Sequence, residues 1–252
     1  MGQFDLKGKT AIVTGGNGGI GRGLALALAA AGANVCIAAR NADKMANTQA
    51  ELEALGAQAM SITCDVTDLE QIQRTIEETT ERFGGCDILI NNAGIGQGSP
   101  PEDLADEDWD RTIATNLSSV FRFCRAVYPV FKARGGGKII NIGSEYSLFG
   151  SPMVADYSAS KGGVIQLTKS LAVAWAHANI QVNAIIPGWI TSDMTEPVKA
   201  DTEFFEAIVQ RTPAHRFGEP EELGGASVLL ASAASDFITG QSIVVDGGYS
   251  IS

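Results

Sequence analysis

Four polar residues of this 252-residue chain carry the side chains that proton transfer to and from a carbonyl oxygen requires. Tyr157 and Lys161 are i and i+4 in a stretch with helical periodicity, which places both side chains on one helix face. An unperturbed tyrosine is about 4 kcal/mol from ionisation at pH 7, and an adjacent ammonium lowers that cost. Ser144 follows a strand-like run and offers a hydroxyl to a carbonyl, while Asn116 is a polar residue in a predicted helix. The set predicts acid–base chemistry on a carbonyl or an alcohol.

Taken one at a time, the same four residues also have ordinary structural roles. Tyr157 suits an amphipathic helix and Lys161 a solvated helix face. Ser144 suits a turn, and Asn116 can interrupt a helix. Only their combination favours a catalytic site.

A glycine-rich segment, Thr14–Gly21 (TGGNGGIG), lies between a buried strand predicted at Lys9–Thr14 and an apolar helix predicted at Gly19–Ala31. Glycines permit a tight turn and a close approach of the backbone to a pyrophosphate, and the helix N-terminus offers oriented N–H groups. An ordinary glycine-rich turn is the alternative interpretation. The strand–turn–helix context favours a dinucleotide-binding site.

The second predicted strand, Asn34–Ala39, ends without the acid that usually holds the ribose 2′-hydroxyl of NAD. Arg40 follows instead, and a guanidinium suits a 2′-phosphate, although it also suits a solvated strand end. Asp43 is explained as a first-turn residue of the next helix. The sequence therefore favours NADP(H), with NAD(H) as the alternative.

Apolar strand-like runs alternate with helical patterns along the chain. The remaining strands are predicted at Gln58–Thr63, Asp87–Asn91, Lys138–Ile142, Gln181–Ile186 and Ile243–Val245. The remaining helices are predicted at Ala42–Gly56, Asp68–Phe83, Asp106–Lys132, Ala155–His177 and Glu219–Ala231.

Strands that are apolar on both faces and joined by helices demand a parallel sheet that is covered on both sides. The fold class is therefore α/β: a doubly wound parallel sheet of about seven strands, the Rossmann fold, with helices on both faces. Nothing marks a linker, so residues 1–252 are predicted to form a single dinucleotide-binding and catalytic domain. The irregular segment 188–218, with a helix-like part at Asp201–Arg211, has the length of a substrate-binding lid.

Composition excludes several classes of protein. The net charge is −11, which gives the chain no bulk attraction for nucleic acid or an anionic membrane. The N-terminal segment has no apolar signal core, and no run is long and apolar enough for a membrane span, so we expect a cytoplasmic protein. The four cysteines form no C-x-x-C pair and are expected to be reduced and mostly buried. With two histidines and no Cys/His cluster, no metal site is expected.

Several of these motifs together resemble the short-chain dehydrogenase/reductase family, in its single-domain NAD(P)-dependent form. The resemblance rests on TGGNGGIG, on NNAG at Asn91–Gly94, and on Ser144 thirteen residues before the Tyr-x-x-x-Lys of YSASK at Tyr157–Lys161. Asn116 in NLSSVF, Pro187-Gly188 and the VDGG that ends at Gly248 also match, so the likeness extends over essentially the whole chain.

The resemblance implies a role for each catalytic candidate. Tyr157 would be the general acid in reduction and the base in oxidation, and Lys161 would hold the nicotinamide ribose and lower the pKa of the tyrosine. Ser144 would orient the carbonyl, and Asn116 would position a proton-relay water. These roles define an NADPH-dependent carbonyl reductase or alcohol dehydrogenase, an enzyme that acts on CH–OH and C=O groups.

The resemblance also implies which residues line the cofactor. Asp65 would contact the adenine, the Asn92–Gly94 turn would line the groove, and the segment after the sixth strand would lie along the nicotinamide. The family usually has threonine where this chain has Ser192, with Thr191 beside it, so either hydroxyl can serve the carboxamide. The full cofactor set is Gly15, Asn17, Gly18, Gly19, Ile20, Gly21, Arg40, Asn41, Asp65, Val66, Asn92, Ala93, Gly94, Tyr157, Lys161, Pro187, Gly188, Ile190 and Ser192.

The substrate is less well defined, because this scaffold carries many substrates. Family members that act on acyl carrier protein tend to have basic docking residues, and the corresponding places here are Gly135 and Ala178, although Lys132, Arg134 and Lys138 lie nearby. We therefore favour a small ketone or secondary alcohol, including polyols and sugars, with a 3-oxoacyl-thioester (acyl-carrier-protein) reductase as the alternative. By analogy the substrate wall would include Glu145, Tyr146, Met153, Val154 and Trp189, with Met194 and Phe204–Phe205 close by. Glu145 would either hydrogen-bond a substrate hydroxyl or face solvent.

Other functions are weaker alternatives. A non-catalytic dinucleotide-binding sensor often lacks a catalytic residue, whereas all four are present here. A Ser-His-Asp hydrolase is disfavoured because neither His177 nor His215 has a Ser/Asp partner at recognisable spacing. A nucleotide-sugar epimerase or dehydratase is disfavoured because we expect no extra C-terminal substrate domain in this chain. Family resemblance also suggests a homotetramer paired through an apolar stripe of Leu167, Leu171 and Trp175, although that stripe also suits the core.

Overall fold

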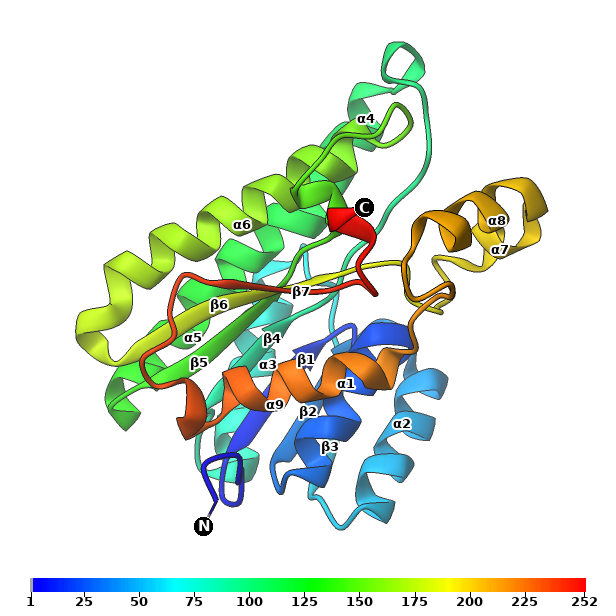
Figure 1. The fold of residues 1–252 in the computed structure, drawn as a ribbon. Helices are drawn as coiled ribbons and strands as arrows, with labels where there is room; N and C mark the ends of the chain where they lie inside the picture. Colours follow the sequence, from blue (N-terminus) through cyan, green and yellow to red (C-terminus); the bar gives the residue numbers. More distant parts are fainter. Residues whose placement is uncertain (1) are drawn as a thin grey trace.

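The computed structural model describes residues 2–252, and Met1 lies outside the described part. Seven strands of this part form one parallel sheet (Figure 1). The strand order is β3-β2-β1-β4-β5-β6-β7. All neighbouring strands pair in parallel, and the direction of winding reverses between β1 and β4, so the α/β doubly wound fold class is confirmed. The strands are β1 Thr10–Thr14, β2 Asn34–Ala39, β3 Ala59–Thr63, β4 Ile88–Asn91, β5 Gly137–Ile142, β6 Ile180–Pro187 and β7 Ser242–Val245.

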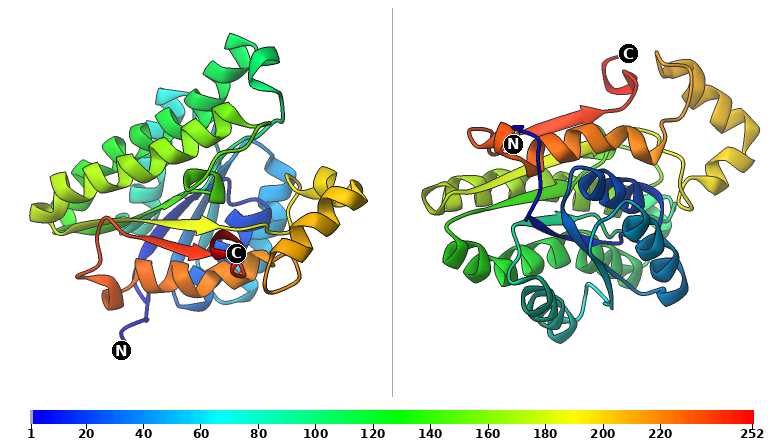
Figure 2. Two further views of the ribbon diagram at one scale, coloured as in Figure 1. Left: turned by 45° about the horizontal axis from the view of Figure 1, so that its top comes forward. Right: turned by 90° about the horizontal axis from the view of Figure 1, so that it is seen from below.

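Helices cover both faces of this sheet (Figure 2). One apolar core joins the sheet to α1 (Gly19–Ala30), α2 (Ala42–Ala54) and α9 (Gly224–Ala231). A second core joins the other face to α3 (Leu69–Phe83), α5 (Ser119–Arg134) and α6 (Ala155–Trp175). Because neighbouring residues of β1 enter opposite cores, the strand is apolar throughout, as the sequence indicated.

Local sequence signals set several helix ends. The Asn41 side chain caps α2 by accepting a hydrogen bond from the backbone N–H of Lys44. Asp68 caps α3 in the same way. Gly84, which directly follows the last residue of α3, has a left-handed φ of 76° and caps its C-terminus. These caps explain why the predicted and observed boundaries of both helices agree closely.

Three predicted helices differ from the observed ones. The stretch predicted at Asp106–Lys132 is not one α-helix: α4 (Asp106–Ile113) and α5 are separated by a π-helical turn at Ala114–Ser118. The stretch predicted from Glu219 begins with a 3-10 turn at Pro220–Leu223, in which Pro220 takes the first position, where its missing N–H costs no intrahelical hydrogen bond. The helix α6 ends at Trp175, and His177 lies in the following 3-10 turn.

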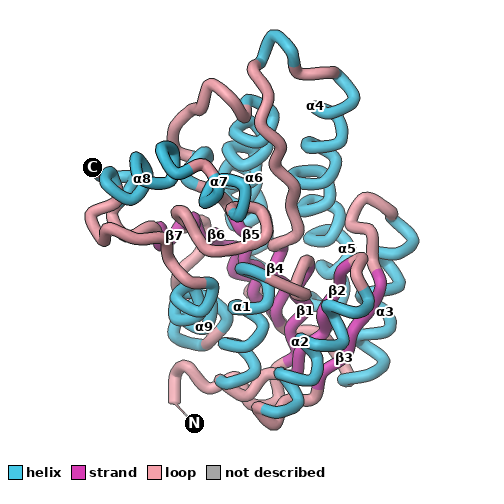
Figure 3. Tube along the Cα trace, turned by 90° about the vertical axis from the view of Figure 1, so that its right-hand side faces the viewer, coloured by secondary structure: helices cyan, strands magenta, loops and turns pink. Residues whose placement is uncertain are grey.

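The segment between β6 and α9 leaves the sheet and extends beyond the carboxyl ends of the strands (Figure 3). It contains α7 (Glu196–Ala200) and α8 (Thr202–Arg211), so the helix-like part predicted at Asp201–Arg211 is confirmed. A small apolar cluster around Ile208, Phe217 and Tyr249 joins this segment to the C-terminal turn. The segment therefore packs against the C-terminal turn.

The stripe of Leu167, Leu171 and Trp175 packs inside the protomer. Leu171 is buried, and the other two side chains pack against the same core, where the Trp175 ring lies 4.9 Å from that of Tyr128. The homotetramer stays a prediction that this stripe does not support. All four cysteines are buried and unpaired, as expected. Within residues 2–252, no helix combines the length and the apolar character that crossing a membrane requires.

The close packing of α1 against the turn before α9 predicts a stability effect. A Cβ added at Gly23 of α1 would lie 2.6 Å from the carbonyl carbon of Pro220, which is backbone and cannot move cheaply. We expect Gly23→Ala to lower the free energy of unfolding by about 1–3 kcal/mol through overpacking. Urea unfolding measures the change.

The matched control is Gly162→Ala in the interior of α6, where the added Cβ meets no atom within 4 Å. It should stabilise the protein by about 0.5–1 kcal/mol through helix propensity. Equal effects of the two substitutions would contradict the packing argument.

Candidate active site

The predicted catalytic and cofactor residues converge at the carboxyl ends of β1, β4, β5 and β6. The glycine-rich turn follows β1, Asn92–Gly94 follow β4, Ser144 follows β5, and Pro187-Gly188 end β6. These strands are neighbours in the sheet, so their ends form one edge. In open α/β sheets this edge, at the reversal of strand order, is where ligands bind.

The glycine-rich turn folds back closely on its own backbone. A Cβ at Gly21 would lie 2.2 Å from the carbonyl oxygen of Gly15, and Gly15 itself has a φ of 63°. No side chain fits at Gly21, and none fits at Gly15 without strain. The turn is thus shaped to expose backbone N–H groups at the start of α1, which is a suitable cradle for phosphates.

Asn92 ties this turn to the end of β4. Its side-chain amide donates to the carbonyl oxygens of Thr14 (3.0 Å) and Gly15 (3.2 Å). The Thr14 hydroxyl in turn accepts from the backbone N–H groups of Asn92 (3.0 Å) and Ala93 (3.1 Å). Two of the predicted cofactor segments are therefore held together by hydrogen bonds, and Thr14 is a positioning residue absent from the predicted site set.

The ends of β2 and β3 continue the strand-end edge beyond β1. Arg40 is exposed at the end of β2, and its charge acts on Asp65, which follows β3. Hydrogen bonds from the backbone N–H and hydroxyl of Thr67 lower the pKa of Asp65, with a smaller contribution from Arg40. Asp65 is thus held as a carboxylate. The Arg40 guanidinium lies near enough to act on it but has no carboxylate oxygen within 4 Å among the described residues.

Asn116 lies in the π-helical turn and is fully buried. Its amide pairs with the backbone of Ile95 in both directions, accepting from the N–H (2.8 Å) and donating to the carbonyl oxygen (2.7 Å). It also donates to the hydroxyl of Ser160 in α6 (3.2 Å). Asn116 therefore interrupts the helix, as its alternative structural interpretation suggested, and links the loop after β4 to the helix that carries Tyr157.

A short 3-10 turn, Glu145–Ser147, positions Ser144. The Ser144 hydroxyl accepts from the N–H of Tyr146 (3.3 Å), which leaves its own proton free to donate. The Ser147 hydroxyl accepts from the N–H of Ser144 (3.1 Å) and donates to the carbonyl oxygen of Lys161 (2.9 Å). Ser147 thus fixes the separation of Ser144 from α6, a role that the sequence analysis missed.

Tyr157 and Lys161 emerge from the same face of α6, as their spacing predicted. The Lys161 ammonium lies 5.6 Å from the centre of the Tyr157 ring and donates to the carbonyl oxygen of Ile142 at the end of β5 (2.8 Å). Only 4% of Lys161 is exposed, and burial lowers its pKa to about 8. Burial raises the pKa of Tyr157, while the nearby Ser144 hydroxyl lowers it.

Aromatic side chains form a wall beside Tyr157. The Tyr146 ring lies edge-on to Tyr157 at 6.3 Å and to Trp189 at 6.4 Å. Trp189 also contacts Phe204 (5.8 Å) and Phe217 (5.8 Å), so Tyr146 and Trp189 join the catalytic helix to the segment 188–218. The Trp189 indole N–H is buried and has no hydrogen-bond partner among residues 2–252.

The loop after β4 also lies against Tyr157. A Cβ at Gly96 would lie 3.2 Å from the Tyr157 ring and 3.8 Å from the sulfur of Met194, so the loop passes directly over the tyrosine. Val154 pairs with Ser99 of this loop, and Met153 is half exposed at its rim. Gly96 was not in the predicted set, and a glycine just past NNAG is the only signal that could have found it.

Residues 190–195 cover the start of α1. The Cβ of Ser192 lies 3.0 Å from the position that a Cβ of Gly19 would take, whereas the Thr191 hydroxyl contacts Glu219 and Lys199 instead. Of the two hydroxyls left open by the sequence, that of Ser192 thus lies closer to the glycine-rich turn. Thr195, missed by the sequence analysis, donates to the carbonyl oxygen of Ile190 (2.8 Å) and accepts from the N–H of Ser192 (3.0 Å).

Glu145 does not face solvent: 3% of it is exposed. The solvent-facing alternative was therefore wrong. The side chain turns inward between the ends of β6 and β7, where a Cβ on Gly188 would lie 2.8 Å from its Oε1. Burial raises the pKa of this carboxyl to about 8; Asp246 adds to the shift and Arg211 opposes it.

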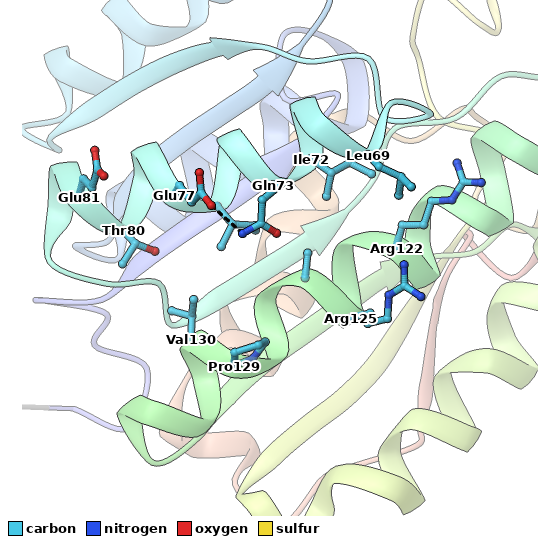
Figure 4. A pocket seen from close by; sticks show the side chains of 12 residues that line it. Leu69, Ile72, Gln73, Glu77, Thr80, Glu81, Arg122, Arg125, Pro129 and Val130 are labelled. Carbon is cyan, nitrogen blue, oxygen red and sulfur yellow. Dashed lines mark hydrogen bonds between the residues drawn. The ribbon is translucent and has the colours of Figure 1, made fainter.

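A surface groove between α3 and α5 is separate from these residues (Figure 4). Its floor is apolar, with Ile72, Ile76 and Val130, and Arg122 and Arg125 lie at one end. None of the predicted catalytic or substrate residues lines it. The groove is therefore separate from the site predicted at the strand-end edge.

Comparison with known proteins identifies the class. A family model described as enoyl-(acyl carrier protein) reductase matches residues 15–250. The chain belongs to this family and, through it, to the short-chain dehydrogenases/reductases. It is an oxidoreductase that acts on CH–OH and C=O groups with a nicotinamide dinucleotide.

The individual relatives include sugar-acid enzymes. Gluconate 5-dehydrogenase of Gluconobacter oxydans is 43% identical over 249 residues, which cover 99% of this chain and 97% of that protein. The 5-keto-D-gluconate 5-reductase of Escherichia coli K12 is 38% identical and covers 97% of this chain and 96% of that protein. The crystal structure of a gluconate 5-dehydrogenase from Burkholderia cenocepacia in complex with NADP and tartrate is 40% identical, with a TM-score of 0.95 and coverage of 99% and 98%.

The buried ammonium of Lys161 predicts a pH-dependent stability difference. Its pKa is about 8 in the folded protein against 10.5 in the unfolded chain, so the unfolded state binds more protons between these values. Burial of the Lys161 ammonium therefore lowers the free energy of unfolding by about 3 kcal/mol below pH 8, and this cost disappears as the pH rises toward 10.5. We expect Lys161→Met to gain stability relative to wild type at pH 7 and to lose that advantage by pH 10.

Urea unfolding of both proteins at pH 7 and pH 10 measures this difference directly. Other groups titrate in both proteins and cancel in the comparison. A difference that is independent of pH would contradict a buried, depressed ammonium at this position.

Proposed function

We propose that this protein is an NADP(H)-dependent dehydrogenase/reductase that interconverts a secondary alcohol and a ketone on a small polyhydroxylated substrate, of which sugar acids are the leading class. The observation that carries the proposal is the convergence of Ser144, Tyr157 and Lys161 beside the glycine-rich turn. No other cluster among residues 2–252 combines a proton donor, a carbonyl-orienting hydroxyl and a dinucleotide cradle.

The proposed chemistry divides among these side chains. A nicotinamide, when bound, supplies or accepts the hydride. The Ser144 hydroxyl donates a hydrogen bond to the substrate oxygen and so orients the carbonyl. Tyr157 donates its phenolic proton to that oxygen in reduction and withdraws it in oxidation. Lys161, anchored to Ile142, places a positive charge beside the tyrosine and favours the phenolate.

The residues present fit a dinucleotide. The cradle at Gly15 and Gly21 has room for backbone approach only, and the adjacent start of α1 favours an anion. Arg40 is exposed at the end of β2 and has no ion-pair partner among residues 2–252, which suits the 2′-phosphate of NADP. Relatives crystallised with NADP support the same preference.

We infer that residues 188–218 act as the lid of this site. Ser192 contacts the glycine-rich turn, and an ion pair joins Asp193 of the segment to Lys44 of α2. These contacts close the segment over the groove in which the cofactor would lie. Trp189 brings the aromatic wall with it.

The relatives' substrates support the sugar-acid class, and the docking surface argues against the thioester alternative. Of the basic residues near the expected carrier-protein contact, Arg134 is paired with Asp87 (3.1 Å) and Lys138 is buried against Asp236 (2.7 Å). Only Lys132 is left to attract an acidic carrier. A chain of net charge −11 would associate poorly with such a partner.

Tyr157→Phe tests the acid–base assignment. Removing one hydroxyl should lower kcat about 10²–10⁴-fold because the proton donor is lost. The Kd for NADPH should change little, since the ring and its packing are kept. Initial rates with 5-keto-D-gluconate and a fluorescence titration with NADPH measure the two quantities.

Tyr128→Phe is the control, because Tyr128 packs against Trp175 away from the strand-end edge. Full turnover by Tyr157→Phe on every substrate that the wild type accepts would refute the assignment.

Arg40→Asp tests the cofactor preference. The substitution replaces the proposed phosphate ligand with a carboxylate that repels phosphate and suits a ribose diol. We expect kcat/KM for NADPH to fall about tenfold or more, while that for NADH is kept or rises. Arg82→Asp, at the exposed end of α3, controls for the change in net charge. An unchanged preference for NADPH would count against Arg40.

A further inference from the structure

Glu145 has a carboxyl group that the protein leaves without a partner. It is 3% exposed, and its Oε1 is fully buried and has no hydrogen-bond partner within residues 2–252. A buried polar group without a hydrogen bond is destabilising, because its lost contact with water is not replaced. Such a group is uncommon in a folded protein and calls for a ligand or another explanation.

The charged neighbours of Glu145 are already engaged. Asp246, at the end of β7, accepts hydrogen bonds from the N–H groups of Gly248 and Ser250 (both 2.8 Å). Arg211, at the end of α8, donates to the Tyr249 hydroxyl (3.2 Å) and stacks on its ring at 4.1 Å. Neither neighbour supplies the missing hydrogen bond.

The position of Glu145 brings it to the reacting centre. It directly follows Ser144, and its Oε1 abuts Gly188, where β6 ends. When ionised, it raises the pKa values of both Tyr157 and Tyr146, so its carboxyl lies near both tyrosines. A polar group of a ligand held by Ser144 and Tyr157 is therefore the partner closest at hand.

We propose that Glu145 is a specificity-determining residue that hydrogen-bonds a hydroxyl group of a polyhydroxylated substrate whose carbonyl is held by Ser144 and Tyr157. This inference rests on the proposed function and deepens it, because a simple ketone has no hydroxyl to offer. A carboxyl accepts from a substrate hydroxyl, and when protonated it also donates. A site built around such a bond rejects analogues that lack the hydroxyl.

The protonation state of Glu145 links this contact to substrate charge. Because burial and Asp246 raise its pKa to about 8, Glu145 is neutral at pH 7 even though Asp246, whose pKa is lowered by its hydrogen bonds, is ionised. Arg211 opposes the shift, and the remaining titratable groups that face Glu145 are Tyr157 and Tyr146. A neutral Glu145 accepts an anionic sugar acid, whereas an ionised one repels it.

Two variants and three carbonyl compounds test the proposal. The compounds are 5-keto-D-gluconate, which is an anion with hydroxyls, D-fructose, which is neutral with hydroxyls, and levulinate, which is an anion without them. Glu145→Leu removes the hydrogen bond and should lower kcat/KM for the two hydroxylated compounds about 10–100-fold, with no loss for levulinate. Glu145→Gln keeps a donor and an acceptor and should restore most of the activity at pH 7.

A pH series separates recognition from a structural effect. In the wild type, KM for 5-keto-D-gluconate should rise above pH 8 while KM for D-fructose does not; in Glu145→Gln, KM for 5-keto-D-gluconate should stay flat. Glu81→Leu, on the exposed face of α3, is the matched control. Equal losses on all three compounds, or wild-type kinetics in Glu145→Leu, would overturn the role of Glu145.

The failure of the proposed function would look different. In that case the wild type would turn over levulinate or a simple ketone but neither 5-keto-D-gluconate nor D-fructose. This result would overturn both proposals. Melting temperature and NADPH affinity of each variant establish that the fold and the cofactor site are intact.

Discussion

The parallel direction of the strands is the constraint on which the site depends. Because every strand of the sheet runs the same way, residues that directly follow β1, β4, β5 and β6 meet at one edge. The hydrogen bonds of Asn92 to the glycine-rich turn, of Ser147 to α6 and of Lys161 to β5 then fix the distances across that edge. The catalytic set is thus a consequence of topology that a few buried polar contacts make rigid.

Burial then acts in opposite directions on two groups at this edge. It lowers the pKa of Lys161 and raises that of Glu145, so at neutral pH the basic group sits near its titration range and the acidic group is neutral. Ionised Glu145 would raise the pKa of Tyr157, whereas the Ser144 hydroxyl lowers it. The arrangement therefore keeps uncompensated negative charge away from the tyrosine at neutral pH.

Much of this molecule could be predicted from local sequence. The alternation of apolar runs and helical patterns indicated all seven strands, and the i, i+4 spacing of Tyr157 and Lys161 fixed their common face. The predicted starts of α2 and α3 agree with the structure, where Asn41 and Asp68 cap these helices; a cap needs only a few neighbouring residues.

The features that the sequence missed or left open depend on residues far apart in the chain. The interruption of the helix at Asn116 comes with hydrogen bonds from its amide to the backbone of Ile95, and the inward orientation of Glu145 comes with its packing beside Gly188 and Asp246. Gly96 matters because Tyr157 lies against it, and Thr195 because it braces the backbone around Ser192. No periodicity records such contacts, since each arises only when the sheet brings the segments together.

The central claim is that NADPH bound at this edge gives a hydride to the ketone of a polyhydroxylated acid, while Tyr157 supplies the proton. Two single-turnover reactions of the wild type with 5-keto-D-gluconate test it most directly, one with (4R)- and one with (4S)-deuterated NADPH, with the products analysed by NMR and mass spectrometry. One of the two reactions is expected to place one deuterium at the newly formed carbinol carbon and the other none. Deuterium at that carbon from neither isotopologue, or equally from both, would contradict the claim.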